Sequence, residues 1–164
     1  MIDRRTTLGL LAAFPAMSAL AAAGVPAASA ARYTVSFTPA EWKRRLGAEA
    51  YDVLREEATE RPFTSPLNNE KRAGLFVCRG CALPLFSSQH KFESGTGWPS
   101  FWQPATKTAI GSTVDRSFMM TRTEVHCSRC GGHQGHVFED GPRPTGLRYC
   151  INGLSLAFVP GKTT

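Results

Sequence analysis

Apolar residues recur at helical spacing in one region, just after residue 38. Thr38 precedes Pro39, and Glu41 follows two residues later, which is the pattern of a capped helix start. Trp42 and the apolar residues at positions 46, 51 and 54 then form a stripe that is interrupted near Gly47. We therefore expect two short helices between Pro39 and about residue 59.

From Gly74 onward, short apolar runs alternate with Gly, Pro, Asn and Ser. The strand-like runs are Leu75–Val77, Ser117–Met120, Thr123–Val125, Leu147–Ile151 and Leu154–Val159. Pro62 and Pro66 end the helical region, and residues 63–67 are expected to be extended. Because no later run has a helical period, the predicted fold class is mainly β, with an antiparallel core and short amino-terminal helices.

The first thirty residues have the composition of an export signal. The pair Arg4-Arg5 precedes an apolar stretch, Leu8–Val25, and Ala28–Ala30 supplies small residues for a cleavage site. We expect a cleaved twin-arginine signal peptide at residues 1–30, one domain at residues 31–164, and a periplasmic location. A membrane anchor is the alternative, but Pro15, Pro26 and the many alanines favour a cleaved signal over an anchor.

Charge and length limit the partners of the domain. The 164 residues carry a formal net charge of +6, and the basic residues are interspersed with acidic ones, as in Arg55-Glu56-Glu57. Such a mixed surface argues against nucleic acid as a partner, and we expect no membrane partner for the mature domain. The length supports one ordinary core, and a monomer is the expected state.

The five cysteines divide into two Cys-x-x-Cys pairs and one remaining thiol. Cys78 with Cys81, and Cys127 with Cys130, have the spacing that places two sulfurs at adjacent corners of a tetrahedral metal site. We expect these four to hold one structural zinc ion with no open position for chemistry. Disulfide pairing and redox-active dithiols are the alternatives. Cys150 is left over and becomes the candidate nucleophile.

Two histidines in a glycine-rich frame are candidates to assist that thiol. His133 and His136 stand in the run 131–138, and imidazole can lower the pKa of a thiol or deliver a proton because it titrates near neutral pH. The His-x-x-His spacing also permits a second metal site with Cys150 as a third ligand, although no carboxylate is suitably spaced nearby. A strand cysteine can also be only a small buried apolar residue.

Trp98 stands between Gly97 and Pro99, which places a large ring at the tip of a loop. Most aromatic residues belong to the core, but a ring held in this way can form the wall of a pocket. A pocket made of an indole, two imidazoles and a thiol favours a small, soft and partly apolar group. A derivative of a thioether fits that description.

Four runs of residues carry a family resemblance: Pro84–Ser88, Lys91–Phe101, Gly135–Pro142 and Arg148–Asn152. On these runs the chain resembles the type B methionine sulfoxide reductases, from about Thr38 to Val159. The resemblance implies two antiparallel sheets with helices at the amino end. It also implies reduction of the R epimer of methionine sulfoxide in proteins or peptides, and structural zinc on the paired cysteines.

The resemblance further implies roles for single residues. Cys150 is expected to attack the sulfoxide and become a sulfenic acid, and His133 and His136 to organise or protonate the sulfoxide oxygen. Asn152 is expected to support the site by hydrogen bonding. The residues implied in substrate binding are Trp98, which receives the methyl group, and Phe138, which adds to the pocket wall.

The chain departs from a common pattern of that family at Thr96. Many members carry a resolving cysteine at this place, and once zinc holds four thiols this chain has none left to pair with Cys150. We expect regeneration by an external thiol, either a thioredoxin-like protein or a small thiol. The rival functions are a zinc-ribbon binding module and a peroxide-sensing or disulfide-exchange protein.

Overall fold

The computed structural model describes residues 33–161, and the expected signal peptide at residues 1–30 lies outside them. Two helices open the described part, α1 (Pro39–Leu46) and α2 (Ala48–Glu56), as the sequence predicted. The hydroxyl of Thr38 caps α1 by accepting a hydrogen bond from the Glu41 N–H at 3.2 Å. Gly47, with a φ of 76°, separates the two helices. No helix among the described residues is both long and apolar enough to cross a membrane.

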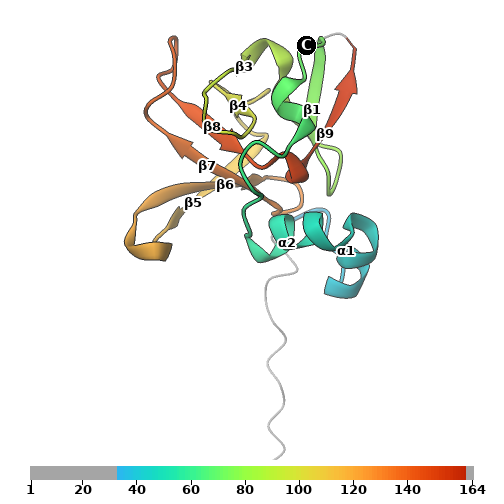
Figure 1. Ribbon diagram of the computed structural model, residues 1–164. Coiled ribbons are helices and arrows are strands. Elements are labelled where there is room, and N and C mark those ends of the chain that lie inside the picture. Colours follow the sequence, from blue (N-terminus) through green and yellow to red (C-terminus); the bar gives the residue numbers. More distant parts are fainter. Residues whose placement is uncertain (1–32, 162–164) are drawn as a thin grey trace, which may run out of the picture.

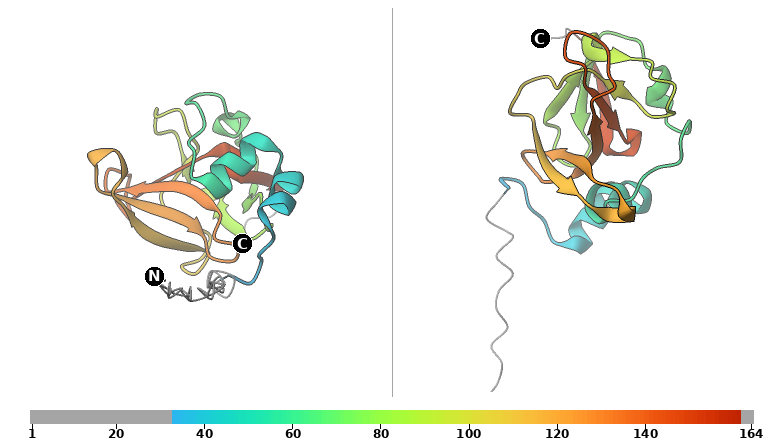
Figure 2. Two further views of the ribbon diagram at one scale, coloured as in Figure 1. Left: turned by 90° about the horizontal axis from the view of Figure 1, so that it is seen from below. Right: turned by 90° about the vertical axis from the view of Figure 1, so that its left-hand side faces the viewer.

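Two antiparallel sheets follow the helices (Figures 1 and 2), which confirms the predicted mainly β fold. The smaller sheet has the order β2-β1-β9 and consists of β1 (Gly74–Cys78), β2 (Pro84–Ser87) and β9 (Leu156–Pro160). The larger has the order β3-β4-β8-β7-β6-β5 and consists of β3 (Lys91–Phe92), β4 (Ser100–Phe101), β5 (Ile110–Asp115), β6 (Arg122–Cys127), β7 (His133–Phe138) and β8 (Arg148–Ile151). Four 3-10 helices in the described chain connect these elements: η1 (Pro66–Asn69), η2 (Ser88–His90), η3 (Ser117–Met119) and η4 (Gly153–Ser155).

An aromatic cluster joins the two sheets. Phe101 of the larger sheet stacks on Phe86 of the smaller one with ring centroids 4.4 Å apart, and it meets Phe76 edge-on at 4.9 Å. All three rings are fully buried, so truncating any of them to alanine is expected to cost about 3–5 kcal/mol. At one end of the molecule, α2 packs on β7 and η4 and buries Leu54 (Figure 1). This packing fixes β7 and the turn after β8.

Three sequence predictions differ from the structure. The run Ser117–Met120 is not a strand: it holds η3 at the tip of the β5–β6 hairpin, where Met119 has a φ of 57°. The expected extended segment at residues 63–67 turns into η1 at Pro66, capped by the hydroxyl of Ser65. The run Leu154–Val159 starts inside η4 before it becomes β9. In each case local turn hydrogen bonds replace the extended backbone that the sequence favoured.

Candidate active site and cysteine cluster

Cys150 lies on β8, and the neighbouring strands β4 and β7 each place a side chain beside it. Its cross-strand partners are Ser100 on β4 and His136 on β7. Residues directly opposed on antiparallel strands share a face of the sheet, with Cβ atoms about 4.5–5.5 Å apart. β7 approaches closely because residue 135 is glycine: its φ is 151°, and a Cβ there would lie 2.1 Å from the carbonyl oxygen of Cys150. The local sequence thus brings thiol and imidazole together.

The thiol of Cys150 is half-buried, and its surroundings keep it protonated. Burial raises the pKa of Cys150, while the Thr96 hydroxyl and the Arg148 guanidinium oppose this effect without cancelling it. The Oγ1 of Thr96 lies 3.7 Å from the sulfur. It belongs to a chain of hydroxyls, because the Oγ of Ser94 lies 2.9 Å from Thr96 Oγ1 and 2.7 Å from Ser100 Oγ. A thiol in this setting needs a base to become a nucleophile.

His136 is held in one orientation by a carboxylate on β5. Its Nε2 lies 2.8 Å from Oδ2 of Asp115. The same oxygen forms an ion pair with the guanidinium of Arg122 at 2.6 Å. The backbone and hydroxyl of Ser117, with His136 and Arg122, hold the pKa of Asp115 well below its usual range. The carboxylate is therefore ionised, so Nε2 carries the hydrogen and Nδ1 is left as an acceptor. Burial lowers the pKa of His136, so the ring is neutral at pH 7.

His133 occupies a deeper position on the same strand. Its side chain is 3% exposed, and its Nδ1 lies 2.8 Å from Oε1 of Glu124 on β6. Burial by itself raises the pKa of Glu124, but hydrogen bonds from His126, His133 and Thr113 outweigh it and lower the value to about 2. The ionised carboxylate fixes the hydrogen on Nδ1. The Nε2 of His133 is buried and has no hydrogen-bond partner among the described residues.

These side chains meet at a small pocket with a volume of about 120 Å³. Its lining consists of Thr59, Trp98, Arg122, His136, Phe138, Cys150 and Asn152. The indole N–H of Trp98 donates to the carbonyl of Glu60 at 3.1 Å, which fixes the polar edge of the ring. The ring of Phe138 is covered by the guanidinium of Arg148 at 4.4 Å. Drug-sized ligands occupy pockets of about 300 Å³ or more, so this one suits the end of a single side chain.

The four paired cysteines form a second, separate cluster. The Sγ atoms of Cys78, Cys81, Cys127 and Cys130 all lie within 4.8 Å of one another. The pairs formed by Cys78 with Cys130 and by Cys81 with Cys127 are 3.6 and 3.5 Å apart. A tetrahedral site with metal–sulfur bonds of about 2.3 Å requires sulfurs about 3.8 Å apart, whereas a disulfide requires about 2.05 Å. The cluster therefore has the dimensions of a metal site, and its thiols are free.

The surroundings of this cluster suit a negatively charged group. The guanidinium of Arg55 donates to the carbonyl of Cys130 at 3.0 Å, and that of Arg129 donates to the carbonyl of Cys81 at 3.2 Å. The amide nitrogen of Gln134, which is fully buried, lies 3.7 Å from the sulfur of Cys78. Cations and N–H donors around four thiols favour their ionised forms, which are the forms that bind a metal.

Comparison with known proteins places the chain in a family. Residues 46–160 match the SelR domain. The chain is 53% identical over 118 residues to the peptide methionine sulfoxide reductase MsrB of Hahella chejuensis, covering 72% of this chain and 85% of that protein. The chain belongs to the MsrB family. It is similarly 56% identical over 120 residues to the MsrB of Pseudomonas putida, covering 73% of this chain and 90% of the relative. The MsrB of Methanosarcina barkeri is 52% identical over 128 residues, with coverages of 78% and 90%.

In this MsrB chain, most of the predicted site residues come together. Those that line the pocket are Cys150, His136, Asn152, Trp98 and Phe138. His133 does not line it but stands behind His136, with ring centroids 5.6 Å apart. Within residues 33–161 no group of three or more metal-binding side chains other than the cysteine cluster was found, so the alternative of a second metal at the two histidines gains no support.

Sequence reasoning missed four polar residues that line the candidate site or hold its histidines: Thr59, Asp115, Arg122 and Glu124. Two of them stand on β6, where the ionisable residues Arg122, Glu124 and His126 occupy every second position. A period of two marks one face of a strand, and it is the sequence signal that could have identified Arg122 and Glu124. Asp115 carried no such signal, because only the pairing of β5 with β6 brings it opposite Arg122.

Proposed function

We propose that this chain reduces methionine sulfoxide, as the R epimer in proteins or peptides, to methionine. The observation that carries the proposal is the pairing of Cys150 with a carboxylate-held His136 at a pocket that fits a side-chain end. Membership in the MsrB family supports the same activity, because its relatives are named peptide methionine sulfoxide reductases. The choice of the R epimer rests on the resemblance to the type B enzymes.

Trp98 and Phe138 are assigned to substrate binding. Both rings line the pocket beside Cys150, and the Trp98 indole is fixed through its N–H. The apolar faces of two held rings suit the methyl and methylene groups on either side of the sulfoxide sulfur. We propose that this contact places the sulfur against the Cys150 thiol with its oxygen toward His136.

His136 is assigned to moving the proton. As a neutral ring whose Nε2–H is committed to Asp115, it accepts the proton of Cys150 at Nδ1. The thiolate attacks the sulfoxide sulfur, and the imidazolium returns the proton to the oxygen as negative charge develops there. The oxygen then passes to the Cys150 sulfur as the bond between the two sulfurs and the sulfur–oxygen bond of the substrate break, so one thiol and one sulfoxide give one sulfenic acid and one methionine. His133 is assigned to supporting His136 from behind.

Asn152 is assigned to holding the pocket together. Its Oδ1 accepts from the backbone N–H of Glu60 at 3.0 Å, and its Nδ2 donates to the carbonyl of Gln134 at 3.2 Å. Both ends of the amide are thus engaged, and the side chain is 3% exposed. It ties the end of β8 to β7 and to the segment after α2.

Regeneration is proposed to need an external thiol. Thr96 is the residue next to the sulfur, and the other four cysteines lie together in their own cluster. The sulfenic acid at Cys150 therefore reacts with a thioredoxin-like protein or a small thiol, which first forms a mixed disulfide and then releases Cys150. No disulfide within the chain is expected during turnover.

We further propose that the cysteine cluster holds one zinc ion. Cys78, Cys81, Cys127 and Cys130 fit its tetrahedral preference in number, ligand type and spacing. Zinc bound by four thiolates supplies structural cross-linking and has no open position. Its ligands lie at the ends of β1 and β6 and in the turns beside them, so it links the two sheets.

Export is part of the proposal and rests on the sequence. The pair Arg4-Arg5, the apolar stretch after it and the small residues up to Ala30 support a twin-arginine signal and a periplasmic mature protein. The twin-arginine route carries folded proteins, so zinc can be inserted before export. Amino-terminal sequencing of the protein from a periplasmic extract should start at residue 31, and an uncleaved chain in the cytoplasm would contradict this part.

A single-turnover assay tests the proposed reaction. The prereduced mature protein is mixed with peptides that carry either the R or the S sulfoxide, in the absence of any other thiol. We expect about one equivalent of methionine per protein from the R peptide only, together with a sulfenic acid at Cys150 found by mass spectrometry after trapping. No methionine from either peptide, with the metal content intact, would contradict the proposal and favour the binding-module alternative.

A further inference from the structure

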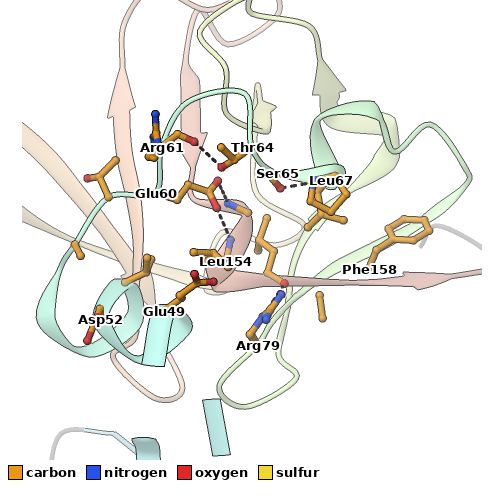
Figure 3. Close-up of a pocket in the computed structure, with 17 residues that line it drawn as sticks. Glu49, Asp52, Glu60, Arg61, Thr64, Ser65, Leu67, Arg79, Leu154 and Phe158 are labelled. Atoms are coloured by element: carbon orange, nitrogen blue, oxygen red, sulfur yellow. Dashed lines mark hydrogen bonds between the residues drawn. The ribbon is translucent and has the colours of Figure 1, made fainter. Parts of the chain in front are cut away.

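Glu60 is a buried acidic residue next to the active site whose chemistry the proposed reaction does not use. It follows α2 and is 7% exposed. It lines a larger cavity of about 600 Å³ (Figure 3), and its neighbour Thr59 lines both that cavity and the small pocket. A buried carboxylate is unfavourable unless it is well paired, so its partners indicate why it is there.

The partners of the carboxylate are two backbone N–H groups of η4. Oε1 accepts from Gly153 at 2.5 Å and Oε2 accepts from Leu154 at 2.9 Å (Figure 3). Hydrogen bonds to an ionised acceptor are about twice as strong as neutral ones. Both donors stand directly after Asn152, three and four residues beyond Cys150. The carboxylate thus clamps the chain at the point where it leaves the catalytic strand.

The backbone of the same residue holds two members of the pocket. The N–H of Glu60 donates to Oδ1 of Asn152 at 3.0 Å, and its carbonyl accepts from the indole N–H of Trp98 at 3.1 Å. The ring proposed to receive the substrate methyl group and the amide beside the thiol therefore meet at one peptide segment. Any shift of that segment moves Trp98 relative to Cys150.

The turn after β8 leaves little conformational freedom for the segment that contains Glu60. A Cβ at Gly153 would lie 1.9 Å from Oγ of Ser65 and 3.2 Å from Oε1 of Glu60. The glycine therefore lets the chain after Cys150 come close enough for both N–H groups to reach the carboxylate. With the carboxylate fixed by two strong bonds, the peptide groups of Glu60 are fixed as well.

We propose that Glu60 is a positioning residue that sets the distance between the methyl-binding indole of Trp98 and the thiol of Cys150. It acts through its carboxylate, which anchors its own backbone to the turn after β8. The inference rests on the proposed reductase function. A displacement of about 1 Å in a substrate-positioning group can reduce a rate about 10²-fold, so loss of the anchor should be visible in kinetics and not only in stability.

Variants of Glu60 test this role in the zinc-loaded mature protein. Glu60→Ala removes both acceptors, whereas Glu60→Gln keeps one acceptor and places an NH₂ against the other N–H. We expect the maximal single-turnover rate per folded molecule to fall about 10²-fold for Glu60→Ala and about tenfold for Glu60→Gln. The sulfoxide concentration that gives half of this rate should rise in both. The matched control is Glu49→Gln, since Glu49 lines the same larger cavity but is exposed (Figure 3).

The readouts separate positioning from a loss of folded protein. Rates are normalised to molecules that carry zinc and have the wild-type circular dichroism, so a purely structural role leaves both kinetic constants of that fraction unchanged. Such unchanged constants would overturn the assignment while the reductase function stands. Should Glu60→Ala fail to fold, the Glu60→Gln constants decide by the same criterion. A wild-type protein that yields no methionine overturns the reductase function and this assignment together.

Discussion

At Cys150, a thiol whose pKa is raised by burial stands opposite an imidazole whose pKa is lowered by burial. Neither group is ionised at neutral pH when taken separately. The proton transfer proposed between them would create both charges at once, a thiolate and an imidazolium, and Asp115 is placed to stabilise the second of these. In this scheme the charges arise at the pocket proposed to bind the sulfoxide.

Replacing the thiol tests the centre of this scheme. In Cys150→Ser the hydroxyl has a far higher pKa and cannot accept the oxygen as a sulfenic acid, so methionine formation should fall to background. The zinc content and the melting temperature should stay at wild-type values, because the residue lies outside the cysteine cluster. Single-turnover assays with metal analysis check both points, and retained activity would point to a different nucleophile.

Asp115 gives a second test at this scale. In Asp115→Asn the amide can present its NH₂ to Nε2 of His136, which moves the ring hydrogen to Nδ1 and removes the acceptor for the Cys150 proton. We expect the single-turnover rate to fall by about 10²-fold or more at pH 7. Glu139→Gln, an exposed acidic residue just after β7, serves as the control and should react like the wild type. Equal rates for the two variants would exclude a role for the carboxylate.

Thr96 is the third residue with a separable effect. Because its Oγ1 lies 3.7 Å from the sulfur of Cys150, a thiol in its place needs little movement to form a disulfide. After one turnover, Thr96→Cys should show a disulfide between positions 96 and 150 in peptide mapping, and no trappable sulfenic acid. The wild type and the exposed control Thr106→Cys should keep the sulfenic acid. A sulfenic acid that persists in Thr96→Cys would mean that the two positions do not approach in solution.

At the scale of elements, the three-stranded unit β5–β6–β7 carries the charges behind the active site. Glu124 of β6 binds His133 of β7 and Thr113 of β5 at 2.8 and 2.7 Å. The carboxylate thus cross-links three strands, and its pKa of about 2 compares with an ordinary value of 4.5. A carboxyl group whose pKa is lowered on folding stabilises the fold above its ordinary pKa, and this contribution is lost as the pH falls through the lowered value.

The expected pH dependence of stability follows from the lowered pKa of Glu124. At pH 7, Glu124→Gln should lower the free energy of unfolding by about 3 kcal/mol. The gap to the wild type should close as the pH falls from 4.5 toward 2, because the wild-type carboxylate is protonated there. Urea unfolding of both proteins over this range, with Glu57→Gln as an exposed control, provides the measurement. A gap that is constant with pH would show that the loss comes from packing and not from the charge.

The same elements show what the sequence could and could not predict. The helices and β8 were predictable because capping and apolar spacing are local signals, as at Thr38 and Leu147–Ile151. β7 was not, because Gly135 in its interior lowers strand propensity, and this glycine is needed there only through contact with Cys150. The site motifs located the thiol, the histidines and Trp98. Their supports, such as Asp115, depend on strand register, which the sequence does not reveal without the pairing partner.

At the scale of the whole molecule, the cysteine cluster and the active site share elements but not functions. Cys127 ends β6, which also carries Arg122 and Glu124, and the turn after it leads directly into the β7 histidines. The zinc proposed at the cluster would therefore fix one end of β6, whose Arg122 pairs with the Asp115 that holds His136 and whose Glu124 binds His133. The zinc proposed there is expected to act on activity through the fold alone.

Removing one ligand tests that separation of roles. Cys81→Ser is expected to lose stoichiometric zinc and to lower the stability of the fold by about 5 kcal/mol or more, because metal binding and folding are coupled in such sites. Activity should fall only in proportion to the folded fraction, since the active site itself lacks no residue. Calorimetry, zinc analysis and the single-turnover rate per folded molecule distinguish this from Cys150→Ser, which should lose the rate and keep the metal. A Cys81→Ser protein that keeps a full equivalent of zinc and melts like the wild type would show that the cluster does not hold the two sheets together.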